Sequence, residues 1–416
     1  MKLNRRNHFP AQTATAIAAS CDRLPWGGLL ALAMAAFICI FTETIPAGLL
    51  PQLSEGLGIS EALAGQLVTS YALGSLMAAI PVTAATRGWP RRRLLLVTMT
   101  GFLAFNSVTA MSSDFALTLA ARFFAGVSGG VLWGMAAGYA RRMVPDALKG
   151  RALAVAMVGS PLAMALGVPA GTFLGGLAGW RAVFGIMSLI TVLLIVWIVR
   201  KMPEYPGQQA AGRTSLRTIF MMKGVRPVLA VVLLWVLAHN ILYTYIAPYL
   251  ARAGLAGRVD LTLLIFGLAS IVGIWIVGMW IDRMQHKMVL VSLAGFALAS
   301  LLLGVAAGQP ALIYLAVALW GLTFGGAGTL LQTAMAETAG EHADVGQSML
   351  VTAWNLAIGG GGFIGAVMLE TMDAGSLPWA LLLLTLLALL AAWRIKVTRF
   401  TSRKRGEGPT LLPEPE

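Results

Sequence analysis

Gly278-Met279-Trp280-Ile281-Asp282-Arg283 closes a long apolar run with an acid next to a base. A similar ending occurs 196 residues earlier, at Thr86-Arg87. The same offset pairs the double glycine of residues 129–130 with that of residues 325–326. The chain therefore contains one pattern twice. Since both copies consist of apolar segments long enough to cross a bilayer, the repeat predicts a duplicated bundle of membrane helices.

Composition excludes water as the solvent for most of the chain. Of the 416 residues, 58% are hydrophobic and only 11% are charged, and the mean hydropathy is +0.80. Soluble domains carry roughly 25% charged residues. The net charge of +13 is compatible with nucleic-acid binding, but the basic residues lie in short gaps between apolar runs, where they set membrane topology instead. We therefore expect the lipid bilayer as a partner, and no nucleic acid.

The apolar runs define the fold class. Twelve of them approach the roughly 20 residues that a spanning helix needs, six in each half. Backbone polar groups in lipid must be satisfied within their own segment, so each run must be helical. We predict an all-α membrane protein with twelve transmembrane helices in two six-helix bundles related by an internal repeat. The expected parts are a cytoplasmic N-terminal tail (1–24), an N-terminal bundle (25–200), a flexible cytoplasmic linker (201–227), a C-terminal bundle (228–393) and a cytoplasmic C-terminal tail (394–416).

Lys and Arg are distributed unevenly between the gaps. The even-numbered gaps and both tails are rich in them, whereas the odd-numbered gaps hold only Arg181, Arg252 and Arg258. Because basic loops stay on the cytoplasmic side, both termini are predicted to be cytoplasmic. The gap after the tenth run contains Glu337 but no basic residue and is an exception. The first run is too long for a signal-peptide core, so we expect a multi-pass protein of the bacterial inner membrane.

Two charged residues fall inside apolar runs, where a charge costs at least about 2.5–3.5 kcal/mol. Glu43 lies about 15 Å, and Arg122 about 12 Å, below the outer surface at the helical rise per residue. Their similar depth makes Glu43 a candidate proton carrier, with Arg122 as its charge partner. A permanent ion pair that only fixes two helices is the alternative.

His239 is the position that matches Glu43 in the second half. Imidazole titrates near physiological pH, so proton relay or substrate hydrogen bonding is plausible, and a buried neutral histidine is equally compatible with the sequence. Asn240 follows it directly, and Tyr243 lies four residues on, which places His239 and Tyr243 on one helix face. We predict that Asn240 and Tyr243 line a substrate cavity.

Other polar and aromatic side chains in the apolar runs are also cavity candidates, although such residues more often pack between helices. They are Tyr71, Asn106, Trp133, Gln332, Trp354 and Asn355. Trp180, close to a span end, is expected in the membrane interface instead. Gly167, Pro169 and Gly171 remove side chains and a backbone donor from the fifth run, so we expect a bend there that contributes to gating.

Several functional classes lack their signatures in this sequence. It contains no phosphate-binding Gly-x-x-x-x-Gly-Lys loop, no metal-ligand spacing and no Ser/His/Asp constellation. Its two cysteines, Cys21 and Cys39, form no disulfide framework, and Cys39 fits a small buried hydrophobe. We therefore expect no enzymatic activity and no cofactor.

These residues resemble the major facilitator superfamily over essentially the whole chain. Gly278 to Arg283, continued to Lys287, is similar to that superfamily's glycine-aspartate-arginine-basic signature, which implies an inner gate formed by Asp282 and Arg283 with neighbouring helix ends. The matching first-half loop keeps the basic residues Arg87 and Arg91, also expected to act in gating, but has Thr86 where the family usually has Asp.

Three further motifs refine the resemblance. Arg122 with Gly126 is similar to the motif that the family associates with proton coupling. The segment 167–172 matches the antiporter motif only loosely and looks more like the sugar-efflux-type permeases. The opening Thr42 to Pro51 also resembles exporters of arabinose, nucleosides and chloramphenicol.

The combined expectation is a secondary active transporter, most simply a monomer, that exports a small organic solute in exchange for protons by alternating access. Sugars, nucleosides and neutral drugs all suit the uncharged candidate cavity. A proton-coupled importer of the same fold and a non-transporting membrane sensor are the alternatives.

Overall fold

The computed structural model describes residues 24–79, 81–86, 88–207, 216–222, 224–306 and 308–406. Within these ranges the backbone is helical apart from short turns and bends, and no strand is present. Ten helical stretches in this part of the chain are long and apolar enough to cross a membrane. The predicted all-α membrane fold is therefore confirmed. The number twelve stays a prediction.

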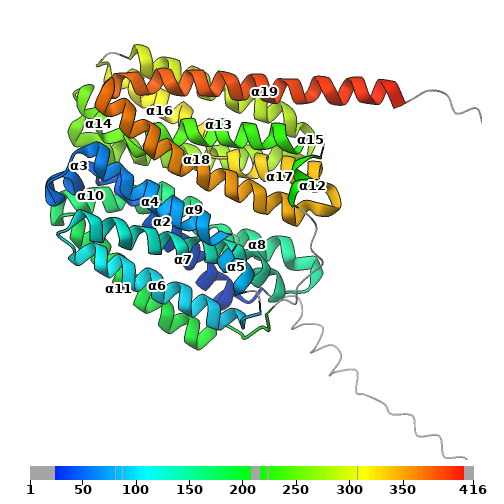
Figure 1. Cartoon of the computed structure of the whole chain (residues 1–416), viewed down its shortest axis with the longest axis horizontal. Helices are drawn as coiled ribbons and strands as arrows, with labels where there is room; N and C mark the ends of the chain where they lie inside the picture. Colours follow the sequence, from blue (N-terminus) through cyan, green and yellow to red (C-terminus); the bar gives the residue numbers. More distant parts are fainter. Residues whose placement is uncertain are drawn as a thin grey trace, which may run out of the picture.

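Helices of the first half form one layer of the molecule (Figure 1). Asp114 caps the N-terminus of the longest first-half helix, Phe115–Arg142. Its carboxylate accepts a hydrogen bond from the backbone N–H of Leu117 at 2.7 Å. The helices are α2 (Trp26–Gly48), α3 (Leu50–Leu57), α4 (Glu61–Ala79), α5 (Pro81–Ala85), α6 (Arg91–Met111), α7 (Phe115–Arg142), α8 (Lys149–Met157), α9 (Gly159–Leu162), α10 (Val168–Ala178) and α11 (Trp180–Lys201).

Helices of the second half form the other layer. They are α12 (Leu216–Phe220), α13 (Val225–Thr244), α14 (Ile246–Arg252), α15 (Val259–Val305), α16 (Pro310–Phe324), α17 (Ala327–Ala339), α18 (Ala343–Thr371) and α19 (Leu377–Gly406). At 47 residues, α15 would be about 70 Å long if straight, more than twice the thickness of a membrane core. It breaks at Met284, where the backbone leaves helical geometry (φ −137°, ψ 26°).

Corresponding helix breaks occur in the two halves. Leu49 separates α2 from α3 with φ −109° and ψ 13°, and Tyr245 separates α13 from α14 with φ −110° and ψ 28°. The two breaks lie 196 residues apart, which is the offset of the sequence repeat.

The apolar core shows where the halves meet. One cluster of buried residues runs through the whole second half and includes first-half residues from α3, α10 and the adjoining parts of α2, α4 and α11. A second cluster is confined to the rest of the first half, around α6, α7 and α8. The halves therefore share a continuous core at the end that carries α3, α10 and α14, called here the α3–α14 end (Figure 1). The opposite end, with α8 and α17, is the α8–α17 end.

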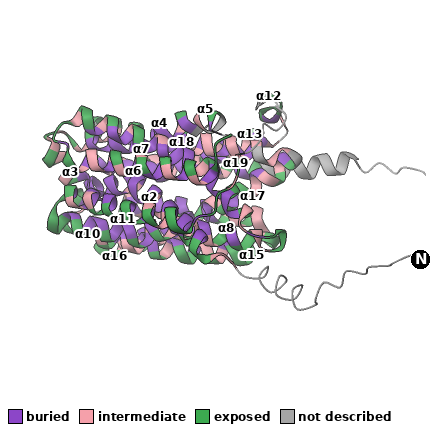
Figure 2. Ribbon diagram, turned by 90° about the horizontal axis from the view of Figure 1, so that it is seen from below, coloured by how far each residue is buried: buried purple, intermediate pink, exposed green. Residues whose placement is uncertain are grey.

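The outer surface is apolar. Exposed residues lie over the outer faces of both layers (Figure 2). They include large hydrophobic side chains such as Met111, Leu177 and Val291, which are 85%, 71% and 69% exposed. Such a surface is stable only where lipid replaces water as the solvent.

Part of the predicted flexible linker packs against the first half. The backbone N–H of Arg91 donates to the carbonyl of Tyr205 at 2.9 Å, and the hydroxyl of Tyr139 donates to the carbonyl of Pro203 at 2.7 Å. The rings of Tyr139 and Tyr205 also meet edge to face. Pro203 and Tyr205 of the linker therefore make specific contacts with the first half, and flexibility of the linker stays a prediction. Residues 208–215 and 223 of the linker lie outside the described residues, as do residues 1–23 and 407–416 of the tails.

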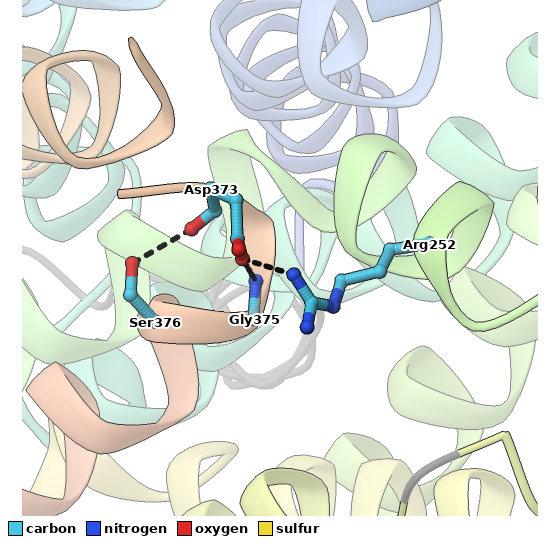
Figure 3. Close-up of polar contacts among 4 residues, drawn as sticks. All are labelled: Arg252, Asp373, Gly375 and Ser376. Carbon is cyan, nitrogen blue, oxygen red and sulfur yellow. Dashed lines mark hydrogen bonds and ion pairs between the residues drawn. The ribbon is translucent and has the colours of Figure 1, made fainter. Parts of the chain in front are cut away.

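The turn between α18 and α19 lies at the α3–α14 end and contacts α14 through an ion pair (Figure 3). Asp373 adopts φ 101°, a left-handed conformation that side chains rarely take. Its carboxylate accepts from the backbone N–H of Gly375 at 2.5 Å and forms an ion pair with Arg252. The Gly375 N–H and then the Arg252 guanidinium lower the pKa of Asp373. Both charged side chains are more than half exposed.

Candidate functional site

The structure brings Glu43 of α2 and Arg122 of α7 together inside the first half. The Arg122 side chain is fully buried, and Glu43 is 7% exposed. Arg122 donates through Nε to the carbonyl of Leu67 and through Nη2 to the main-chain carbonyl of Glu43, both at 3.4 Å. The guanidinium thus connects α7 to α4 and α2.

Arg122 is not fully satisfied by these bonds. Its Nη1 has no hydrogen-bond partner in the described part of the chain. The guanidinium carbon lies 5.0 Å from the centre of the Tyr71 ring and 5.8 Å from that of Phe184. The Glu43 carboxylate interacts with it electrostatically without a direct ion pair. A buried cation held by two long bonds is costly, so a nearby negative charge changes its energy strongly.

Two further polar side chains of the first half, Tyr71 and Asn106, donate hydrogen bonds to α2. Asn106 donates to the hydroxyl of Thr42 at 3.0 Å, and the Tyr71 hydroxyl donates to the carbonyl of Cys39 at 3.3 Å. The Cys39 thiol also lies 3.3 Å from the Tyr71 hydroxyl, so this cysteine is buried but makes a polar contact. We call the set the first-half polar centre. It comprises Thr42, Glu43, Tyr71, Asn106 and Arg122.

His239 of α13 occupies a different environment. Its ring stacks on Phe324 with a centroid distance of 3.6 Å and an interplanar angle of 7°. Centroids of Tyr243, Trp320 and Phe266 lie 5.2, 5.3 and 5.7 Å away. His239 is 4% exposed, and its Nδ1 has no partner among the described residues. These five rings are the second-half aromatic centre.

Tyr243 connects the two centres. Its side chain is 3% exposed, and no hydrogen-bond partner of its hydroxyl is found in the described ranges. The hydroxyl lies within electrostatic range of the Glu43 carboxylate and close to the Thr44 hydroxyl, both on α2. A second-half phenol therefore faces the charged residues of the first half. Asn240, in contrast, donates to the carbonyl of Val236 in its own helix at 2.9 Å.

The remaining cavity candidates separate into two groups. Trp354 joins the aromatic centre, with its ring 6.4 Å from that of Phe324, and Trp133 lies next to Cys39 of the first half. Asn355 is buried but donates to its own helix at 3.0 Å, and Gln332 is exposed. The structure therefore does not join Asn355 or Gln332 to either centre by a hydrogen bond among the described residues.

The predicted gating residues of the signature loops lie at the α8–α17 end. Asp282 and Arg283 are exposed beside the Met284 break, and neither forms an ion pair within the ranges that the structure describes. Arg91 is buried at the start of α6. Arg87 lies outside the described residues.

Where a bend was expected in the fifth run, the helix contains a π-helical turn, η2 (Ala163–Gly167), that precedes α10. Pro169 lies in the first turn of α10. A Cβ added at Gly167 would lie 2.8 Å from the Phe37 ring, and one at Gly171 would lie 2.7 Å from Phe41. These glycines therefore permit close packing of this segment on α2.

Tyr245 and Gln66 are contacts between the halves that were not predicted. The Tyr245 hydroxyl donates to the carbonyls of Gly362 at 2.8 Å and of Ala62 at 3.3 Å, and the Gln66 amide donates to Gly362 at 3.2 Å. A Cβ added at Gly65 would lie 2.1 Å from the Tyr245 hydroxyl. The available signal was a tyrosine at the helix break with glycines in α4 and α18. These bonds join α4 to α18 towards the α3–α14 end.

Two layers of membrane-length helices that share a core at one end, with a buried charged centre in the first layer, are typical of membrane transporters. The profile of the Major Facilitator Superfamily matches residues 32–362 and 259–414. The chain belongs to this superfamily, whose members are transporters and not enzymes.

Individual relatives agree. The chain is 27% identical over 360 residues to a probable sugar efflux transporter of Mannheimia succiniciproducens, covering 86% of this chain and 91% of that protein. A D-xylose-proton symporter structure has a similar fold (TM-score 0.75, 15% identity, 90% of this chain and 98% of that one). So does a human organic anion transporter (TM-score 0.64, 19% identity, 88% and 98%).

Proposed function

We propose that this chain exports a small organic solute in exchange for protons, by alternating access between two six-helix bundles. The observation that carries the proposal is the buried Glu43 carboxyl, which lies within electrostatic range of both the Arg122 guanidinium and the Tyr243 hydroxyl of the other half. An ionisable group in this position responds both to protons and to the relative position of the halves.

The architecture that we propose has twelve spans. The stretch 256–305 is 50 residues long and breaks at Met284, so we count it as two crossings. We count α4, with 19 residues, as a further crossing. The equal backbone conformations of Leu49 and Tyr245 support the internal repeat. We further propose bundles at 25–200 and 228–393, cytoplasmic termini, a monomer and a bacterial inner-membrane location.

In the proposed mechanism, Glu43 carries the proton. Protonation removes its negative charge and thereby weakens its attraction to Arg122. The hydrogen bonds of Arg122 to α2 and α4 then stabilise the inward-open and outward-open states to different extents. Protonation therefore shifts the equilibrium between these two states. Solute binding shifts the same balance, so proton and solute become coupled through one equilibrium.

For the solute, we propose a neutral sugar, nucleoside or drug-like molecule held between the two centres. The aromatic rings around His239 offer flat apolar faces, and Tyr243 and His239 each offer a polar atom without a partner in the described chain. The name of the relative from Mannheimia is consistent with a sugar. In this proposal His239 contacts solute, and Glu43 with Arg122 handles the proton.

The test is solute flux in proteoliposomes of known orientation under an imposed pH gradient. We expect uphill accumulation with the unmodified chain and none with Glu43→Gln. The matched control is Glu55→Gln, because Glu55 is an exposed carboxylate on α3. Uphill accumulation by Glu43→Gln, or a flux that ignores the pH gradient, would contradict the proposal.

The same vesicles address the two alternatives. An importer of this fold would accumulate solute in the opposite direction at the same orientation. A non-transporting sensor would show no solute flux.

A further inference from the structure

An apolar groove runs along the lipid-facing side of the second half. It lies between the second segment of α15 and α19, which pack against each other, and its volume is about 520 Å³. The lining residues are Leu290, Val291, Ala294, Leu386, Leu389, Leu390 and Trp393. The only polar group among these side chains is the indole N–H of Trp393, so the groove suits a hydrocarbon chain.

The small side chain of Ala294 makes the groove possible. Ala294 is exposed, whereas its neighbours along the groove are leucines, a valine and a tryptophan. A larger residue at this position would fill the space between the two helices.

One mouth of the groove is basic. Lys287 precedes Leu290 and Val291 by three and four residues, which places it on their helix face. Arg394 follows Trp393 directly at the same end of the groove, because α19 runs antiparallel to this segment of α15. Lys287, Arg394 and Trp393 are all exposed. Tryptophan is enriched at the level of lipid headgroups, and paired basic residues at this level attract anionic ones.

We propose that this groove binds one acyl chain of an anionic phospholipid whose headgroup is held by Lys287 and Arg394. A second copy of the chain fits less well. A symmetric dimer places the same patch against itself, so two Lys287 and two Arg394 side chains would approach one another. The lipid supplies opposite charge at the mouth and hydrocarbon in the groove. This inference does not depend on which solute is transported.

The headgroup contact is tested by lipid titration of the full chain in detergent. Phosphatidylglycerol is compared with phosphatidylcholine of the same acyl chains, and bound lipid is counted by native mass spectrometry. We expect tighter binding of phosphatidylglycerol. The double variant Lys287→Gln/Arg394→Gln should weaken it roughly 30-fold and leave phosphatidylcholine unchanged, from about 1 kcal/mol per basic residue. Arg93→Gln/Lys201→Gln, which removes two exposed basic residues of the first half, should retain the preference.

The groove itself is tested by Ala294→Phe, which should reduce binding of both lipids. Leu298→Phe is the control, because Leu298 is 49% exposed one turn further along the same helix and does not line the groove. Equal affinity of the unmodified chain for the two lipids would overturn the proposal. So would a lipid preference that survives the loss of both cations. A dimer that is disrupted by Ala294→Phe, with lipid binding unchanged, would assign the groove to a second copy instead.

Discussion

The two halves differ in chemistry at positions that lie 196 residues apart in the sequence. Each residue of the first-half polar centre has a counterpart 196 positions later, and most of these counterparts are apolar. Thr42, Glu43, Tyr71, Asn106 and Arg122 correspond to Ala238, His239, Gly267, Leu302 and Ala318. The buried cation and the carboxylate occur only in the first set. Buried charges therefore lie in the first half, and a cluster of stacked aromatic rings lies in the second.

Residues at matched positions of the two halves therefore have different surroundings. Glu43 borders a fully buried guanidinium with an unpartnered Nη1, whereas His239 is stacked on Phe324 and bordered by three more rings. Burial of a charge costs stability, while burial of stacked rings contributes to it. We expect substitutions in the first half to affect coupling, and those in the second half to affect stability and solute binding.

The largest effect is expected when Arg122 is replaced by an apolar residue, because its counterpart in the second half is the apolar Ala318. Arg122→Met should reduce proton-driven accumulation by about 100-fold, the upper range of a coupling energy between two sites. Arg122→Met leaves the buried Glu43 carboxylate without its cation, so stability is read from Arg122→Met/Glu43→Gln, whose melting temperature in detergent should not fall because both charges are removed. Transport assays of the single variant and thermal unfolding of the double variant give the two values. A large fall in melting temperature would favour a permanent ion pair that only fixes the helices.

A second comparison concerns the matched helix breaks, where the first half has Leu49 and the second half has Tyr245. Tyr245→Phe removes the bond to Ala62 of the first half, together with the bond to Gly362 that positions the hydroxyl, so separation of the halves at the α3–α14 end should become roughly ten-fold more frequent. The readout is maleimide labelling of Thr69→Cys, because Thr69 is buried near Gly362 between α4 and α18. The background is the same chain without the introduced cysteine.

Tyr249→Phe is the matched control for Tyr245. The Tyr249 hydroxyl donates to the carbonyl of Leu303 at 2.7 Å, entirely within the second half. Its loss should leave labelling of Thr69→Cys unchanged. Equal labelling in both variants would show that the Tyr245 bonds do not hold the halves together.

Substitutions of His239 test whether the second half takes part in proton coupling. His239→Phe preserves the stack on Phe324 but removes the ring nitrogens that we propose to contact solute. Solute affinity should therefore fall, whereas accumulation driven by a pH gradient at saturating solute should change by no more than about three-fold, less than a single kcal/mol. His239→Ala should lower the melting temperature, because it leaves a cavity among four rings. Loss of coupling in His239→Phe would give the second half a proton-relay role and remove the contrast.

The smallest effect on stability is expected at the exposed ion pair of Asp373 with Arg252. It is the reference for the buried charges of Glu43 and Arg122. Asp373→Asn should change the melting temperature by less than about 2 °C, because solvent screens its pairing with Arg252. The pKa of Asp373 is lowered in the folded chain, so any stabilisation is present above the unfolded value and is lost as pH falls through the folded one. Unfolding measured between neutral and acidic pH checks both statements.

The sequence was sufficient for the class of fold and for the neighbourhood of Glu43. Apolar length, the repeat and the depth of two charges predicted helices that cross a membrane and a meeting of α2 with α7. It did not predict that Arg122 binds main-chain carbonyls of Glu43 and Leu67, because such contacts depend on helix rotation and on the glycines that set the spacing.

Other differences come from tertiary packing that periodicity does not encode. Trp180 was expected in the membrane interface but is 4% exposed, because α3 covers it and Gly56 lies against its indole. Tyr205 was expected in a flexible linker but packs on Tyr139. In both cases the environment of an aromatic ring was predicted only from its position near a helix end. The residues that actually contact the ring are distant in the sequence.

The short connection between the two segments of α15 has a consequence for the membrane around the protein. The segment beside Ala165 and the segment that lines the lipid groove are joined at the Met284 break without an intervening loop, so movement of one is passed to the other. Rotation of the first away from Ala165 would displace the second against neighbouring lipid. Each transport cycle would then do mechanical work on the bilayer, and turnover would vary with bilayer thickness and stiffness.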